Sequence, residues 1–424
     1  MRANIAECLS GNIFEEPVGM STCHDYDVAV VGGGVAGVAA AAAAARMGAK
    51  TVLIEKTCVP GGLASAGLIN IYLPLCDGNG SQVTFGIAEE LMRRALKYGP
   101  GTIPPDWMTK RDAAEAERLR CVFAPASLIL AVEELLLENG VDVWYDTLAV
   151  SVCKDGRYLQ TLSVENTDGR SEIHAKAFVD ATGGAYLSRM AGEEVFFAGN
   201  VLSFWTLEYE GKRLPGRDRM APEINMLARG NADRTFTAPT AKDVSRYMLE
   251  TRAMMRNFYA GEYSMNGYDR FSRWPLVVPS MPQFRKIAAL KGHFVLESGM
   301  EHRRFEDSIG LAADWRKSGP VWEIPFRTLC PRGTDNLFAA GRCISSIGDA
   351  WEITRVIPCA ALTGEAAGYA AALRAENMTA ELSDSVRRRM LGNGNLLHSV
   401  NNPAADCGVS GSRSNDECRM LQSR

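Results

Sequence analysis

Residues 27–55 read DVAVVGGGVAGVAAAAAAARMGAKTVLIE, and this stretch determines the fold. The valine-rich run Asp27–Val31 predicts a strand, and the alanine-dominated run Val35–Met47, closed by Gly48, predicts a helix. A second apolar run, Thr51–Ile54, predicts another strand. Strand, helix and strand at this spacing form a βαβ unit whose strands pair in parallel. The sequence therefore predicts an α/β fold.

The turn between this strand and this helix carries the pattern G-x-G-x-x-G at Gly32, Gly34 and Gly37, and Glu55 follows 18 residues after Gly37. In a βαβ unit this pattern predicts dinucleotide binding, with Gly32 for the tight turn, Gly34 for close approach of a pyrophosphate and Gly37 for close helix packing. Helix N–H groups and the helix dipole stabilise the phosphates without a lysine. Glu55 would bind ribose hydroxyls and repel a 2′-phosphate, which argues against NADP.

Other glycine-rich loops fit less well. A Walker A loop is excluded because Gly37 is followed by Val38 and Ala39 rather than by Lys and Ser or Thr. A glycine-rich turn in an unrelated α/β protein is the other alternative. Such a turn would not need the second strand, Thr51–Ile54, with Glu55 at its end, so the complete pattern argues against it. The glycines and Glu55 do not separate FAD from NAD, so these residues indicate only an adenine dinucleotide.

Composition favours a small-molecule substrate. The net charge is −4, with no block of like charges, so neither nucleic acid nor a membrane surface is expected as a partner, and homo-oligomerisation stays open. The uncharged run Val28–Ala45 is interrupted by Gly32–Gly34 and preceded by Asp25 and Asp27, which argues against a membrane span and a signal peptide.

The 11 cysteines show no C-x-x-C pair and no zinc-ligand spacing, so no metal site is predicted. Their odd number fits a reducing cytoplasm, and each is interpreted as a small buried hydrophobic residue.

The rest of the chain divides by texture. Helices are predicted over Ile87–Tyr98 and Ala126–Glu138, and short strands with turn signals over Val141–Ala181 predict an antiparallel meander. After a stretch rich in Arg, Met and aromatic residues, a strand is predicted at Asn336–Ala340 and an alanine-rich helix at Val356–Leu373. Both resemble in composition the strand and helix of residues 27–47.

These textures predict four parts. They are an N-terminal extension (1–24), a dinucleotide-binding domain made of 25–195 and 320–395, an inserted α+β substrate or cap domain (196–319), and a disordered tail (399–424).

Three segments resemble the FAD-dependent oxidoreductase family of the glutathione-reductase-like fold, in which two dinucleotide-binding units recur. They are Tyr26–Gly67, which includes Glu55-Lys56 and Gly61-Gly62-Leu63-Ala64-Ser65-Ala66-Gly67; Val179–Gly183; and Asn336–Gly368 with Gly341-Arg342 and Arg355-Val356-Ile357-Pro358. The resemblance implies a Rossmann-like FAD-binding domain, in which a parallel sheet is joined to an antiparallel β-meander and the cap domain is inserted.

The resemblance also implies cofactor contacts. Gly61–Ala64 would lie along the pyrophosphate and ribityl chain, and Gly341 and Arg342 beside the ribityl chain. The adenosine end would be approached by Ala149, Ala181, Thr182 and Gly183. The helix beginning near Val356 and Ile357 would point its N-terminus at the flavin, where its dipole stabilises an anion.

Two departures from the family refine this expectation. Histidyl-linked relatives carry a histidine directly after the glycine pair, whereas this chain has Leu63, so noncovalent FAD is expected. Dithiol reductases of this fold carry a C-x-x-x-x-C pair, which this sequence lacks, so disulfide reduction is disfavoured.

Residues 258–304 are rich in arginine and aromatic residues, which suits a carboxylate-bearing substrate because arginine offers a bidentate fork. Arg285 is the main candidate, although a solvated basic face is the alternative and the family's further arginines are replaced by Ile287-Ala288-Ala289. Arg355 would add charge near the flavin or form an ordinary salt bridge. His293 and His302 are candidate bases, and Asn70–Gly80 either faces the flavin or forms a surface loop.

The resulting hypothesis is an FAD-dependent oxidoreductase that transfers a hydride between a small organic substrate, considered as carboxylate-bearing, and noncovalently bound FAD. Two alternatives stay open. One is a flavin-binding subunit for electron transfer or assembly, and the other is an NAD-linked oxidoreductase without flavin.

Overall fold

The computed structural model describes residues 23–103, 120–211, 219–221 and 223–399. Its main sheet has the strand order β5-β2-β1-β8-β7-β6, with β17 paired to β8. The strands of its parallel part are β1 (Cys23–Val31), β2 (Thr51–Ile54), β5 (Asp142–Trp144), β8 (Gly169–Asp180) and β17 (Leu337–Ala339). The predicted parallel βαβ unit is therefore confirmed.

The long strand β8 joins the parallel part to an antiparallel meander. Its first half pairs with β7 (Tyr158–Asn166), which pairs with β6 (Leu148–Asp155), whereas its last residues pair with β17. Side chains of β1 alternate between two cores: Val28 and Val30 pack with helix α1, and Ala29 and Val31 pack on the meander side. The predicted meander is confirmed for β6, β7 and β8, whereas β5, within the range predicted for it, pairs in parallel with β2.

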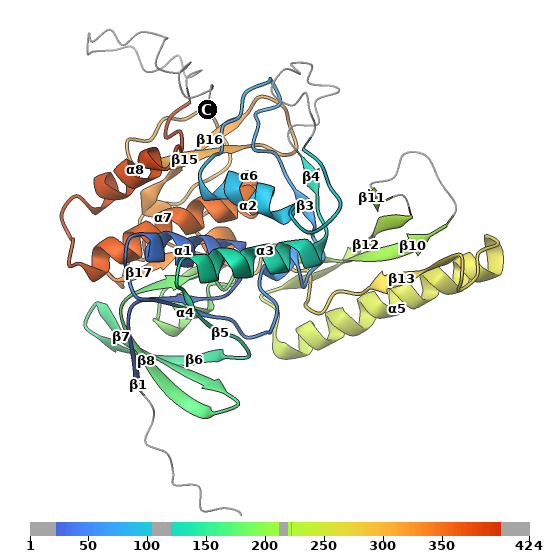
Figure 1. Cartoon of the computed structure of the whole chain (residues 1–424), viewed down its shortest axis with the longest axis horizontal. Helices are drawn as coiled ribbons and strands as arrows, with labels where there is room; N and C mark the ends of the chain where they lie inside the picture. Colours follow the sequence, from blue (N-terminus) through green and yellow to red (C-terminus); the bar gives the residue numbers. More distant parts are fainter. Residues whose placement is uncertain (1–22, 104–119, 212–218, 222, 400–424) are drawn as a thin grey trace, which may run out of the picture.

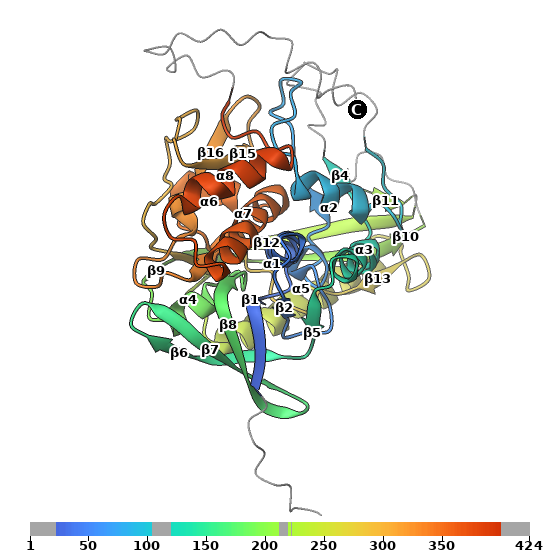
Figure 2. The same cartoon turned by 60° about the vertical axis from the view of Figure 1, so that its left-hand side comes forward.

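Two helices lie side by side on one face of the parallel sheet, α1 (Val35–Arg46) and α7 (Ile357–Ala375) (Figure 2). They approach so closely that a Cβ on Gly364 or Gly368 would lie 2.2 Å from the carbonyl oxygen of Ala36 or Ala40. Only small residues permit this contact, which explains why alanine predominates in α1. The packing sets the N-termini of both helices near the same edge of the sheet.

The insert contains a separate four-stranded antiparallel sheet, of order β11-β12-β10-β13, and the long helix α5 (Ala241–Met265), which extend to one side of the parallel sheet (Figure 1). Its strands are β10 (Gly199–Glu210), β11 (Arg219–Ala221), β12 (Ile224–Thr237) and β13 (Arg273–Val277). Thr240 and Asp243 form a capping box that begins α5. Phe204 and Leu227 of the sheet pack against Met255 and Tyr259 of the helix.

Shorter elements complete the fold. The helices are α2 (Ile87–Ala95), α3 (Pro125–Glu138), α4 (Tyr186–Met190), α6 (Gly348–Thr354) and α8 (Leu382–Gly392), with 3-10 turns η2 (Gly62–Ala64), η3 (Phe326–Leu329) and η4 (Gly341–Cys343). The strands form three pairs: β3 (Ile71–Tyr72) with β4 (Cys121–Val122), β9 (Val195–Phe197) with β14 (Ala288–Leu290), and β15 (Ser308–Ala313) with β16 (Val321–Pro325).

Some expectations are adjusted by the structure. The first strand begins at Cys23, four residues before the predicted start at Asp27, because β1 already pairs with β8 at Glu172. The remainder of the predicted N-terminal extension and the predicted tail beyond Ser399 lie outside the described residues. Leu290 and Ile309, within the predicted insert, pack into the core that contains α1 and α7.

The cysteines differ from the expectation in one respect. Every cysteine in the described part of the chain carries a free thiol, but Cys23, Cys58 and Cys153 are exposed. The interpretation of every cysteine as a buried hydrophobic residue is therefore wrong for these three.

Among the helices that the structure describes, none is by itself long and apolar enough to cross a membrane; only α6 and α7 together meet that length and composition, as a pair bent by 83°.

Candidate functional site

The glycine turn after β1 has the geometry that its sequence predicts. Gly32 adopts a positive φ of 101°, and a Cβ there would lie 2.6 Å from the Ala181 carbonyl oxygen. A Cβ on Gly37 would lie 1.8 Å from the Gly32 carbonyl oxygen. A Cβ on Gly34, by contrast, would meet nothing within 4 Å, and no side chain caps α1. The first N–H groups of α1 therefore stand beside open space, as an anion-binding helix end requires.

Glu55 at the end of β2 is buried and closes one side of this turn. Its carboxylate accepts hydrogen bonds from the Gly33 N–H at 2.6 Å, from the Thr57 N–H at 3.0 Å and from the Thr57 hydroxyl at 2.9 Å. A carboxylate has about four lone-pair sites, so capacity is left for a ligand hydroxyl. Lys56 is exposed.

The second glycine motif lies directly against the first. The Gly61 N–H donates to the Gly33 carbonyl oxygen at 2.7 Å, and Gly61 forms a parallel bridge with Gly34. Gly61 and Gly62 both have positive φ, and a Cβ on Gly62 would lie 3.1 Å from the Gly34 Cα. The turn η2 contains the half-buried Leu63 and the buried Ala64, and the chain continues from it to Gly67.

The third segment reaches the same place from β8. The Ala181 N–H donates to the Val31 carbonyl oxygen at 2.9 Å, and the Thr182 hydroxyl donates to the Asp180 carboxylate at 2.7 Å. Gly183 has a φ of 70°, and a Cβ there would lie 2.3 Å from Nε of Arg342. Ala149 lies half-buried on β6, near Glu55, whose carbonyl oxygen accepts from the Thr147 N–H at 3.1 Å.

Gly341 and Arg342 form the turn η4 after β17. A Cβ on Gly341, which has a φ of 71°, would lie 2.8 Å from the Ala36 Cβ, so η4 lies against the first turn of α1. The Arg342 side chain donates to the Phe284 carbonyl oxygen, and burial lowers its pKa to about 10. Predicted cofactor-contacting residues from four distant segments thus surround the N-terminus of α1.

The N-terminus of α7 provides a second helix end. Val356 is its N-cap and Ile357 its first residue, and no side chain caps it. Arg355, directly before, forms an ion pair with Glu352 at 2.5 Å and lies 5.5 Å from the centroid of the Trp315 ring. Burial alone would raise the pKa of Glu352, but Arg355 and Lys286, at 2.5 Å, hold it below its usual value. Arg355 therefore makes the salt bridge that one sequence interpretation expected.

Arg285 lies close to Arg355 but has no such partner. Its guanidinium is half-buried over the Trp205 ring, with a long 3.4 Å contact to the Gln283 carbonyl oxygen, and it forms no ion pair with any described residue. Burial and then the positive charge of Arg355 lower the pKa of Arg285 to about 9, with a smaller effect of Arg342. The three guanidinium groups share one region, in which Glu352 pairs with Arg355 and lies near Arg285.

Hydrogen bonds made by Gln283 and Asn200 hold the segment around Arg285 in place. Gln283 is buried; its amide donates to the Gly67 carbonyl oxygen and, at 3.1 Å, to that of Trp205, and it accepts from the Trp205 N–H at 2.8 Å. Asn200 of β10 accepts from the backbone N–H groups of Arg285 and Lys286 at 2.7 and 2.9 Å. Sequence reasoning missed both residues, because their role depends on the junction between sheets.

The candidate histidines do not join this site. His293 lines a cavity of about 350 Å³ with Cys330 and Arg374, whereas His302 lines another, of about 460 Å³, with Asp77 and Val83. Neither lining contains Arg285 or Arg355.

The stretch Asn70–Gly80 is not a surface loop over most of its length. Asn70, Tyr72, Cys76 and Asp77 are buried, and the Tyr72 hydroxyl donates to the Ala88 carbonyl oxygen at 2.5 Å.

Comparison with known proteins agrees with the geometry of the glycine turns. The family model of FAD dependent oxidoreductases matches residues 27–268 and 288–389. The chain belongs to the FAD-dependent oxidoreductase family. FAD is accordingly the cofactor, and the flavin-free NAD-linked alternative is set aside.

Relatives of this FAD-dependent oxidoreductase include a digeranylgeranylglycerophospholipid reductase of Picrophilus torridus, 30% identical over 161 residues, which are 38% of this chain and 39% of that protein. A glutathione reductase of Yarrowia lipolytica is 30% identical over 206 residues, 46% of this chain and 39% of that protein. The matched part thus spans about two fifths of these relatives. The structure of a p-nitrophenol 4-monooxygenase from Pseudomonas putida covers 87% of this chain and 86% of its own, with a TM-score of 0.50 and 12% identity, and this likeness shows a shared fold.

The residues present fit FAD in this FAD-dependent oxidoreductase. The uncapped N-terminus of α1, the open space beside Gly34 and the buried Glu55 offer the partners that a pyrophosphate and a ribose need. Gly364 and Gly368, which set the distance between α1 and α7, were missed in the sequence because a glycine within a helix gives no motif signal.

Proposed function

We propose that this FAD-dependent oxidoreductase acts on a small organic substrate that carries a carboxylate, and that Arg285 and Arg355 bind this carboxylate. The observation that supports the proposal is the unpaired charge of Arg285. A half-buried guanidinium without a counter-ion, close to a second cation, is unfavourable until an anion arrives. Arginine is suited to a planar carboxylate because its donors form a rigid fork.

The two arginines have different parts in this proposal. Arg355 is oriented by Glu352 and by the face of Trp315, so it offers a fixed positive charge at the start of α7. Arg285 is fixed at its backbone by Asn200 but has its guanidinium free of carboxylate partners, so it makes the bidentate contact. Arg342, whose side chain lies against Gly183 and donates to the Phe284 carbonyl oxygen, would offset the charge of the cofactor phosphates.

FAD would be held without a covalent link by Gly32, Gly34, Gly37, Glu55 and Gly61–Ala64, and when bound it supplies an acceptor or donor for a hydride. Leu63 has no nucleophilic atom for a bond to flavin. Precipitation with acid should therefore release yellow FAD into the supernatant, whereas a coloured pellet would contradict noncovalent binding.

The substrate class is tested by anaerobic reduction of the enzyme's flavin. A panel of small hydroxy, amino and unsaturated carboxylic acids is compared with the amides of the same compounds, and each is followed by flavin absorbance in both directions, after photoreduction where needed. We expect an acid to change the flavin oxidation state and its amide to do so at least about 100-fold more slowly, the loss expected for one charged contact.

Variants connect this activity to Arg285. Arg285→Met should keep FAD but lose the active acid, and Arg285→Lys should recover part of the rate. Arg270→Met, which removes an exposed arginine of the same insert that stacks on Phe271, is the matched control. Unchanged turnover in Arg285→Met would exclude the proposal. Activity confined to uncharged compounds would exclude it too, and a flavin that no panel member changes would favour an electron-transfer or assembly subunit.

A further inference from the structure

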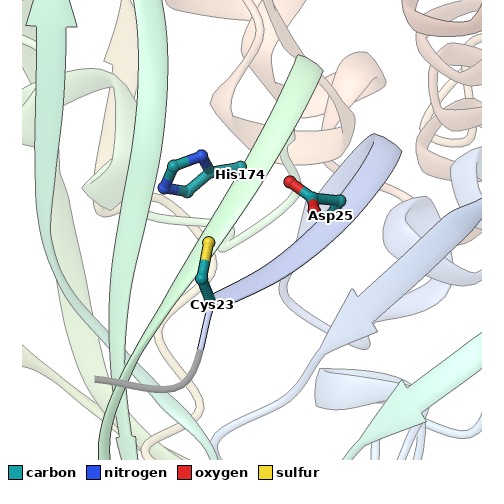
Figure 3. Close-up of side chains that lie close together, drawn as sticks. All are labelled: Cys23, Asp25 and His174. Carbon is teal, nitrogen blue, oxygen red and sulfur yellow. The ribbon is translucent and has the colours of Figure 1, made fainter. Parts of the chain in front are cut away.

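Three potential metal ligands meet at the end of the main sheet opposite the glycine turn. Cys23 and Asp25 lie on β1, and His174 lies on the neighbouring β8, with Asp25 directly opposite His174 in the parallel register. Their side chains project into the same space (Figure 3), and the thiol sulfur, a carboxylate oxygen and an imidazole nitrogen all lie within 4.8 Å of one another. Residues two apart on a strand share a face, so the backbone itself brings these groups together.

A fourth side chain, the carboxylate of Glu172, borders this cluster. Glu172 lies opposite Cys23 in the same register, and its carboxylate is 3.8 Å from Nε2 of His174. The cluster thus offers sulfur, nitrogen and oxygen donors from two adjacent strands of a rigid sheet.

We propose that Cys23, Asp25 and His174 bind a zinc ion, with Glu172 or a water as the fourth ligand. Thiolate, imidazole and carboxylate are the donors of protein zinc sites, and zinc takes four of them in a tetrahedron. Tetrahedral donors stand roughly 3.5 Å apart at the usual bond lengths. Cys23, Asp25 and His174 are exposed and Glu172 is half-buried, so small rotations about their χ angles bring the donors to this spacing without displacing a packed core.

A reactive cysteine is the main alternative use of this trio. The environment argues against it, because the carboxylates of Asp25 and Glu172 lie beside the Cys23 thiol and disfavour a negative charge on its sulfur. A protonated thiol is a poor nucleophile. The same negative charges attract a divalent cation, which then stabilises the thiolate and releases a proton.

The position of the cluster assigns the zinc a structural part. The cluster lies at the first residue of β1, whereas the dinucleotide turn follows its last residue, Val31, roughly 27 Å away at the usual rise of a strand. Zinc here would tie the beginning of β1 to β8, where the described chain begins. The inference does not depend on the proposed substrate.

The test uses the holoenzyme without any histidine tag, stripped of metal and titrated with Zn²⁺ in competition with a chromophoric chelator. We expect one equivalent bound per chain, with release of about one proton at neutral pH. Binding should raise the apparent melting temperature and leave the flavin content unchanged.

Two variants and one control decide the ligands. Cys23→Ser and His174→Ala should each weaken zinc binding at least about 10-fold, the lower limit for loss of a ligand-shell interaction. Cys153→Ser, which removes another exposed cysteine on β6, should bind zinc as the wild type does. With cobalt instead of zinc, the thiolate charge-transfer band should appear in the wild type and be absent in Cys23→Ser. Stoichiometric zinc binding that survives in both variants, or no zinc binding by the wild type, would overturn the assignment.

Discussion

Arg285 and Arg355 lie close enough for the charge of Arg355 to lower the pKa of Arg285, although 69 residues separate them in the sequence. Of these two arginines, only Arg355 has an ion-pair partner among the described residues. That partner is Glu352, which also forms an ion pair with Lys286. The free enzyme therefore carries an excess of positive charge at the junction between the parallel sheet and the insert. This excess of charge should lower the stability of the free enzyme and favour the binding of an anion. Its effect on stability can be measured without a known substrate.

Removal of the Arg285 charge should stabilise the enzyme. For a base whose pKa is lower in the folded state, folding disfavours the charged form, and the whole penalty is present at neutral pH, below the folded pKa. Arg285→Met should therefore raise the free energy of unfolding by about 1 kcal/mol, or the melting temperature by about 1 °C. Differential scanning calorimetry at pH 7 checks this.

The control for this prediction is Arg270→Met, which should leave the melting temperature unchanged. A lower melting temperature in Arg285→Met would show that Arg285 is satisfied in the free enzyme and would contradict the excess of charge.

Loss of Glu352 should have the opposite effect, with a defined pH dependence. Its pKa is lower in the folded state than the ordinary 4.5, so its contribution to stability is fully present above pH 4.5 and is lost as the pH falls through the folded pKa. Glu352→Gln should destabilise the enzyme at pH 7 by about 1–2 kcal/mol, because Lys286 and Arg355 then lack their counter-ion. Urea unfolding at pH 7 and at pH 3.5 measures both values.

The difference between Glu352→Gln and wild type should shrink at the lower pH. Glu376→Gln, at an exposed position after α7, should match the wild type at both pH values. A difference that stays constant with pH would mean that Glu352 acts through packing rather than charge.

The sequence predicted those parts of the fold that depend on local pattern. The glycine turn, the alanine helix and the meander each have a period or a turn signal within a dozen residues, and the structure contains all three. The convergence of Gly61, Gly183 and Gly341 on α1 was available only from the resemblance, since no local pattern relates residues so far apart.

The junction between the sheets was not predictable in the same way. Arg285 was singled out, but its unpaired state follows from what Glu352, Lys286 and Asn200 do around it. Gln283 is one polar residue among many in the sequence. Two of its three contacts are to the backbone of Trp205 within the insert, and the third, to Gly67, exists only after the insert has folded against the Gly61–Gly67 turn.

Glycine substitutions can separate folding from cofactor binding. A Cβ on Gly34 meets nothing within 4 Å and its φ is −67°, so Gly34→Ala should leave the apoenzyme stable. If the pyrophosphate passes this point, the methyl group should weaken FAD binding at least about 10-fold, as a clash of a little over 1.4 kcal/mol would. Fluorescence titration of apoenzyme with FAD measures this.

Substitutions of two further glycines serve as controls for that experiment. Gly368→Ala places a Cβ 2.2 Å from the Ala40 carbonyl oxygen and should destabilise the apoenzyme itself by about 1–3 kcal/mol. Gly392→Ala at the end of α8, with open space around it, should change neither property. FAD affinity in Gly34→Ala equal to that of the wild type would place the pyrophosphate elsewhere.

The last prediction concerns Gln283 as a positioning residue for Arg285. Gln283→Leu removes the hydrogen bonds to Gly67 and to both backbone groups of Trp205, and it leaves these groups buried without partners. Unfolding should become about 2–3 kcal/mol more favourable, the desolvation penalty of one to two such groups. Once a substrate is known, KM should rise more than kcat falls, because Arg285 loses its fixed place and binding suffers first.

A hydrogen bond made by Thr206 of β10, the residue after Trp205, separates this effect from general destabilisation. The Thr206 hydroxyl donates to the Val277 carbonyl oxygen, within the insert sheet and without contact to the Gly61–Gly67 turn. Thr206→Val should lower the melting temperature but leave KM near the wild-type value. If both variants raise KM equally, Gln283 acts through the stability of the insert. If only Gln283→Leu raises KM, the bond to Gly67 is what holds Arg285 in its binding position.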